Sequence, residues 1–158
     1  MTGNPAPPEW WFYHLSRSAL EEAAAPLLQK CLEVGWRVLA VSPRAERLAK
    51  LDAVLWTFDD ASFLPHGQAD APGLDVARQP VLLSAKLANA NNADALMLMD
   101  GVEAPVDAPF RRCMVMFEDS DTGTRNKARG QFKAAKDAGL VTRYFQQTER
   151  GGWKEAGV

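Results

Sequence analysis

The sequence lacks the features of a secreted, membrane-bound or metal-dependent protein. Its two cysteines, Cys31 and Cys113, have no second ligand at a spacing typical of zinc sites. Both lie among apolar residues and are predicted to be buried thiols rather than a disulfide pair. No apolar run approaches the ~20 residues that a membrane helix needs, and the first residues do not resemble a signal peptide. A cytoplasmic protein without membrane contact is therefore expected.

The chain also lacks a large net charge of either sign. Its 158 residues carry a formal net charge of -2, with 47% hydrophobic and 24% charged residues. A duplex-DNA binder is usually strongly basic, because neutralising phosphates supplies most of the non-specific affinity. Any basic function must therefore be local. The length and composition suit one compact globular domain.

Motifs for nucleotide binding and catalysis are missing too. No predicted strand leads into a glycine-rich phosphate loop, so no P-loop is expected. Of the two histidines, His14 alternates with apolar residues and is predicted to be structural, and His66 is predicted at the surface or in an interface. Acidic residues at 118–121 could hold Mg²⁺, but capping of a following helix explains them more simply. No catalytic residue, metal site or cofactor is expected.

Predicted strands alternate with predicted helices along the chain. Apolar runs predict strands at 10–15, 37–41, 81–83, 96–99 and 113–117, and a last one around 144–145. Helical spacing predicts helices at about 18–34, 42–56 and 120–138. This alternation predicts an α/β layer sandwich with a mostly parallel sheet.

Particular residues refine these predicted elements. Ser18 with Glu21 forms a capping-box pattern, and Ser42 before a proline is typical of an N-cap. Pro26 predicts a kink or a break in the first helix. Residues 57–80 are predicted to be a long loop, because glycine and proline interrupt every pattern there.

The last predicted helix carries a cationic stripe with one aromatic residue. At ~100° per residue, its members fall within an arc of roughly 100°. They are Arg125, Arg129, Phe132, Lys133 and Lys136. Such a surface suits a ligand with carboxylates beside an apolar anchor, because arginine can grip a carboxylate through two N–H bonds. Trp153 could form the other wall of a pocket there. The plainer interpretation is a solvated helix face.

A second feature lies around the end of the middle helix. Trp56, Phe63, Leu64 and Pro65 lie close together in sequence, at a helix end and in the loop that follows. Large aromatic residues in a loop can belong to the core. They can also anchor a protein partner, because interface hot spots favour such side chains.

Several segments together resemble the DNA polymerase III chi subunit family. The most specific is the run 51–56 (LDAVLW) followed by 62–66 (SFLPH). The segments 12–15 (FYHL), 36–40 (WRVLA), 92–96 (NADAL) and 132–135 (FKAA) follow in matching order. The resemblance covers about residues 10–154. It sets apart residues 1–9 as a flexible N-terminus and 155–158 as a C-terminal tail.

The resemblance implies a single Rossmann-like domain without a nucleotide site, acting as a clamp-loader accessory subunit in bacterial DNA replication. It implies two partners, psi and the acidic C-terminal tail of single-stranded-DNA-binding protein, with DNA engaged mainly indirectly. By position, psi would contact the Trp56 and Phe63 region, and the tail would contact the basic helix and Trp153. Phe132 stands where the family often has tyrosine.

Two other functions stay open from the sequence. One is a single-stranded nucleic-acid-binding or helicase-associated accessory domain that uses the same stripe. The lone phenylalanine on the stripe argues against it, because single-strand binders usually offer several stacking aromatic residues. The other is an enzyme of unknown type, which the missing motifs disfavour.

Overall fold

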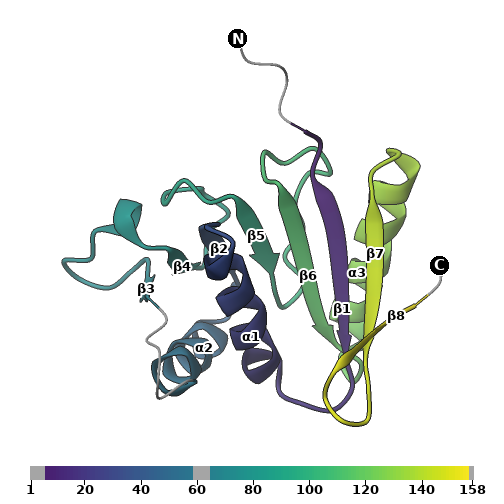
Figure 1. Cartoon of the computed structure of the whole chain (residues 1–158), viewed down its shortest axis with the longest axis horizontal. Helices are drawn as coiled ribbons and strands as arrows, with labels where there is room; N and C mark the ends of the chain where they lie inside the picture. The colour runs from purple at the N-terminus through teal and green to yellow at the C-terminus, as the bar shows by residue number, and fades with distance from the viewer. Residues whose placement is uncertain (1–5, 59–64, 157–158) are drawn as a thin grey trace.

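A single sheet forms the centre of the molecule (Figure 1). The computed structural model describes residues 6–58 and 65–156. Within them, eight strands lie in the order β3-β4-β2-β5-β6-β1-β7-β8, and all neighbours pair in parallel except β7 with β8. The strands are β1 (Glu9–Leu15), β2 (Val38–Val41), β3 (His66–Gln68), β4 (Val81–Ser84), β5 (Ala95–Leu98), β6 (Arg112–Glu118), β7 (Thr142–Gln147) and β8 (Trp153–Glu155).

Helices cover both faces of this sheet. They are α1 (Leu20–Glu33), α2 (Ala45–Thr57) and α3 (Thr122–Asp137), with a short 3-10 helix η1 (Val76–Arg78). The buried side chains of α1 and α2 belong to one apolar layer and those of α3 to the other. Figure 1 accordingly shows α1 and α2 in front of the sheet and α3 behind it. The predicted α/β arrangement with a mostly parallel sheet is confirmed.

Successive side chains of β1 point to opposite faces of the sheet and so enter the two apolar layers in turn. Trp10 and Phe12 pack into the layer on the α3 face, and Tyr13 and Leu15 pack into the layer on the α1 face. The inner strands β2, β4 and β5 are buried at every position, as expected for parallel strands covered on both faces. Burial also confirms both predicted thiols, and it raises the pKa of Cys31 to about 11 and that of Cys113 to about 12.

Both predicted serine caps are wrong. The N-cap of α1 is Ala19; the Ser18 hydroxyl instead accepts a hydrogen bond from Gln147 at 2.7 Å. The N-cap of α2 is Arg44. The Ser42 hydroxyl accepts from the Arg44 backbone N–H at 3.1 Å and donates to Asp100 at 2.6 Å. For Ser18 a tertiary hydrogen bond thus replaces the local one, whereas Ser42 keeps a local bond to the Arg44 N–H but lies before the residue that caps α2.

Helix α1 continues through Pro26 without a break, which corrects that part of the prediction. It ends as predicted before Gly35, whose φ of +82° suits a residue without a Cβ. The predicted loop at 57–80 contains β3 and η1. Strand β8 was also missed, because three residues beside polar neighbours give no apolar run.

Candidate functional site

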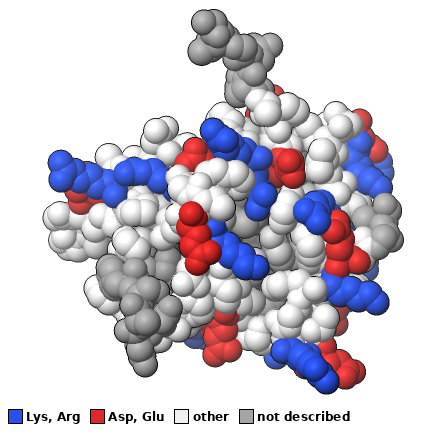
Figure 2. All heavy atoms as spheres, viewed as in Figure 1, with Lys and Arg blue, Asp and Glu red and all other residues white. Residues whose placement is uncertain are grey.

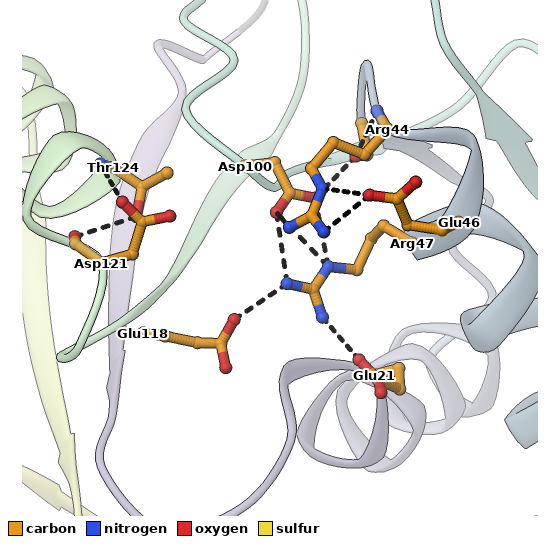
Figure 3. A network of polar contacts seen from close by, with 9 residues as sticks. Glu21, Arg44, Glu46, Arg47, Asp100, Glu118, Asp121 and Thr124 are labelled. Carbon is orange, nitrogen blue, oxygen red and sulfur yellow. Dashed lines mark hydrogen bonds and ion pairs between the residues drawn. The ribbon is translucent and has the colours of Figure 1, made fainter.

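A buried arginine occupies the carboxyl edge of the central strands, where α/β folds commonly bind ligands. Arg47 projects from α2 and is only 7% exposed. Its guanidinium bonds three carboxylates (Figure 3). The distances are 3.1 Å to Asp100, 2.8 Å to Glu118 and 2.5 Å to Glu21. Glu21 therefore serves this cluster rather than a capping box.

Asp100 is the centre of this ionic cluster. Its side chain is 5% exposed and also meets Arg44 and the Ser42 hydroxyl. Burial alone would raise its pKa, but the hydrogen bonds from Arg47 and Ser42 and the two nearby guanidinium charges outweigh burial and lower the pKa. Its φ of 56° is left-handed, a conformation that aspartate tolerates. The cluster joins α1 and α2 to β2, β5 and β6, so it is structural.

Each histidine lies beside a carboxylate. His14 contacts the Tyr144 hydroxyl and the Asp119 carboxylate, each at 2.7 Å, which confirms the predicted structural role. The surface prediction for His66 is wrong, because its side chain is fully buried and lies 3.0 Å from Asp52. Among the residues that the structure describes, no three His, Cys, Asp or Glu side chains are grouped to hold a metal ion.

The predicted cationic stripe lies on α3. Asp121 caps this helix by accepting from the Thr124 backbone N–H at 3.1 Å, as the acidic cluster at 118–121 suggested. Ala128, Gln131 and Ala135 face the sheet and are buried. The five stripe residues lie on the remaining surface, where Arg129, Lys133 and Lys136 are exposed and Arg125 and Phe132 are half-buried.

The cations of the stripe differ in their partners. Lys133 pairs with Asp137 at 2.6 Å, and Arg125 lies 3.5 Å from Asp119. Lys136 places its ammonium 5.6 Å from the centroid of the Phe132 ring. Arg129 forms no ion pair with any residue in the described ranges. Arg129 and Lys136 are therefore the stripe cations that meet a ligand carboxylate without breaking an existing ion pair.

Phe132 lies at the edge of an aromatic cluster. Its ring contacts those of Phe12 and Tyr144 edge-on, with centroids 5.2 and 5.9 Å apart. Burial raises the pKa of Tyr144, and the positive charges of Arg129 and Arg125 oppose that rise. The Tyr144 hydroxyl lies 2.7 Å from His14 Nδ1. Sequence reasoning placed Tyr144 only in a strand and missed that its side chain packs on the same face as Phe12.

Trp153 is not brought together with the stripe. It packs in the layer on the α1 face, with its ring 5.1 Å from that of Tyr13, whereas Phe132 packs on the α3 face. The expected pocket walled by Phe132 and Trp153 is therefore wrong. The sheet separates the two side chains.

The second candidate surface lies at the end of α2. Trp56 is 59% exposed and is the only aromatic residue among the large hydrophobic side chains exposed in the described ranges. Its ring meets His66 edge-on at 5.3 Å. Pro65 is exposed as well. Phe63 and Leu64 lie outside the described residues.

Comparison with known proteins gives two matches. The family model described as "DNA polymerase III chi subunit, HolC" matches residues 8–143, which include Trp56 and the α3 stripe but not Trp153. The curated "Probable DNA polymerase III subunit chi" of Rickettsia prowazekii (strain Madrid E) is 29% identical over 87 residues, covering 55% of this chain and 52% of that protein. The chain thus spans about half the length of this relative. No helix in the described ranges is long and apolar enough to cross a bilayer.

Proposed function

The chain belongs to the DNA polymerase III chi subunit family, and we propose that it is a non-catalytic adaptor of the clamp-loader complex. In this role it joins psi to the acidic C-terminal tail of single-stranded-DNA-binding protein during bacterial DNA replication. The Rossmann-like fold and the domain limits of 10–154 stay predictions of the same resemblance.

One observation supports tail binding most directly. Arg129 and Lys136 flank a half-exposed Phe132 on α3, and neither cation is ion-paired within the described residues. A tail with carboxylates and an apolar end can place its charges on the cations and its apolar side chain against the phenylalanine ring. Charge-assisted hydrogen bonds of this kind contribute about 1.5–3 kcal/mol each.

A labelled acidic peptide ending in Pro-Phe tests this proposal. Binding to the wild type is expected in the micromolar range, on the order of -8 kcal/mol, and removal of the final dipeptide should weaken it because the contact with Phe132 is lost. Arg129→Ala should also weaken peptide binding, whereas the matched control Lys86→Ala should not, since Lys86 is an exposed cation outside α3. Equal affinity for the complete and the shortened peptide would reject the proposed role of Phe132.

We propose that psi binds the surface around Trp56, together with Phe63, Leu64 and Pro65. The support is the exposure of Trp56, since a large exposed aromatic residue is typical of an interface hot spot. Trp56→Ala should weaken psi binding by about 2 kcal/mol or more. Val141→Ala is the control, because Val141 is similarly exposed at 57% but precedes β7. Calorimetry that finds equal losses in both variants would reject this surface.

Single-stranded nucleic-acid binding is the alternative use of the same stripe. If α3 binds an acidic tail instead, this protein alone should retain little single-stranded DNA in a filter assay. Single-strand binders stack bases on several aromatic side chains, and the cationic stripe of α3 has one. Tight retention that Arg129→Ala removes would favour the alternative.

A further inference from the structure

A cavity of about 350 Å³ opens between α1 and the end of the sheet formed by β1, β7 and β8. It lies on the face opposite to α3. Its walls are largely aromatic, with Trp11, Tyr13, Trp36, Phe145 and Trp153 among the lining residues. Two cationic side chains, Lys30 and Arg112, also line it. Apolar walls with a few converging polar groups are the usual composition of a small-molecule site.

Arg112 is held in place by aromatic rings. Its guanidinium carbon lies 3.5 Å from the centroid of the Trp11 ring and 4.9 Å from that of Trp36. It forms no ion pair or hydrogen bond through its side chain with any residue in the described ranges, and its Nε is buried without a partner. A buried donor without an acceptor costs free energy. Among the described residues the chain offers this guanidinium no acceptor, so a ligand acceptor that reaches the guanidinium from the cavity would be favourable.

A neighbouring arginine, Arg143, lies over the same tryptophan and binds a carboxylate. Its guanidinium carbon lies 4.4 Å from the centroid of the same Trp11 ring. It grips Glu155 through two hydrogen bonds, from Nε at 2.9 Å and from Nη2 at 2.6 Å. Two arginines thus lie over one tryptophan, and of these two only Arg143 has a carboxylate partner among the described residues. Arg112 has the same planar guanidinium, and it lines the cavity.

The rest of the cavity fits an aromatic group. The Tyr13 and Phe145 rings stack with centroids 5.2 Å apart, and the Trp153 ring meets Tyr13 edge-on at 5.1 Å. The Tyr13 hydroxyl makes no hydrogen bond with any described residue, so it too can meet a ligand. The volume is near the lower end of ligand pockets, which run from about 300 to 1,000 Å³. One ring and one carboxylate therefore fill it.

A nucleic-acid strand fits this face less well. Two guanidinium groups already lie over Trp11, whereas base stacking needs an open ring face. Figure 2 shows acidic side chains interspersed with the basic ones on this face, with no continuous basic track for a phosphate backbone.

We propose that this cavity binds an aromatic monocarboxylate about as large as one amino-acid residue. The carboxylate pairs with Arg112, and the ring packs against Tyr13, Phe145 and Trp153. A free aromatic acid and the C-terminal residue of a peptide share this chemistry. The site is independent of the proposed adaptor role, because α3 lies on the other face of the sheet.

Calorimetric titration with N-acetylphenylalanine and with its neutral amide tests the site. The acid should bind at least tenfold more tightly than the amide, and Arg112→Gln should remove this preference. Arg112→Lys should keep part of it, since the positive charge is retained. Arg78→Gln is the control and should leave binding unchanged, because Arg78 is an exposed arginine outside both the cavity and α3.

A loss of ligand binding in a variant can be told apart from a loss of folding. Circular dichroism establishes whether each variant is folded, and the contrast between acid and amide in the wild type needs no variant. Equal affinity for acid and amide overturns the proposal, as does unchanged binding in a folded Arg112→Gln variant or no binding of the acid at millimolar concentration. A hexapeptide with neutral side chains and a C-terminal phenylalanine is titrated into the Arg129→Gln variant, which weakens the proposed α3 site. Tighter binding than that of the acid, lost on further Arg112→Gln substitution, identifies a peptide source. Equal or weaker binding of the hexapeptide identifies a free acid.

Discussion

At the scale of single residues, Arg129 should matter most for tail binding. It is exposed and free of ion pairs among the described residues, whereas Lys133 must first leave Asp137, 2.6 Å away. Arg129→Ala should therefore weaken binding of the acidic peptide about tenfold, and Lys133→Ala less than that. Fluorescence anisotropy of a labelled peptide measures both. A larger loss in Lys133→Ala would contradict this order.

Asp100 should make the free energy of unfolding depend on pH in the acidic range. Its pKa is lowered in the folded state, so it binds its proton more weakly there than in the unfolded chain. The resulting stabilisation is present above the unfolded pKa of about 3.9 and is lost as the pH falls through the lower folded pKa. Asp100→Asn should lower the free energy of unfolding by about 2–3 kcal/mol at pH 7. The loss stays in this range because Arg47 keeps its other two carboxylates.

Urea unfolding at several pH values measures this effect. The difference between wild type and Asp100→Asn should shrink as the pH is lowered into the acidic range. Asp75→Asn is the control, because Asp75 pairs with Arg78 at the surface, where such pairs contribute about 0–1 kcal/mol. A difference that stays constant with pH would contradict the assigned role of Asp100.

At the scale of elements, Gln147 connects the end of β7 to the turn between β1 and α1. Its side-chain oxygen accepts from the backbone N–H groups of Ser16, Arg17 and Ser18 at 3.2, 2.8 and 3.1 Å. Gln147→Ala leaves these three N–H donors without that acceptor and should lower the free energy of unfolding by about 1–3 kcal/mol. Gln146→Ala, at the exposed neighbouring position, should change stability little. Thermal unfolding compares the two, and equal melting temperatures would contradict this role.

The elements also show what a sequence can and cannot predict. The strands β1, β2, β4, β5 and β6 were predicted because each is an uninterrupted apolar run, and α3 because its caps and periodicity agree. Strand β3 has three residues, including Gly67, and depends on pairing with β4. The Ser18 cap failed because Gln147, distant in sequence, donates to its hydroxyl. Ser42 accepts from the Arg44 N–H as a cap would, but α2 begins only at Ala45.

The candidate site was predictable to the same extent. Helical periodicity alone grouped the stripe from Arg125 to Lys136, because those residues share one helix. Placing Trp153 required the register of β8 against β7, which no local pattern indicates. The Arg47 cluster escaped prediction as well, since its carboxylates come from three separate segments.

At the scale of the whole molecule, the two proposed partner surfaces lie on different sides of the sheet. Figure 1 shows α2 in front at one end and α3 behind the other end. This placement leaves both proposed partner surfaces accessible at once. Trp56→Ala should therefore leave the affinity for the acidic peptide unchanged, because distant sites without shared partners are usually independent. A change of more than about threefold in anisotropy titrations would indicate coupling between the surfaces.

The salt dependence of peptide binding tests the central claim, that α3 receives an acidic tail, most directly. The dissociation constant of the labelled peptide would be measured from low to high salt for the wild type, Arg129→Ala and Lys86→Ala. Since exposed charge pairs are screened by salt, binding should weaken with salt in the wild type and in Lys86→Ala, and its dependence on salt should be shallower in Arg129→Ala. Salt-insensitive binding, or the same dependence in all three proteins, would contradict the assignment of the tail to α3.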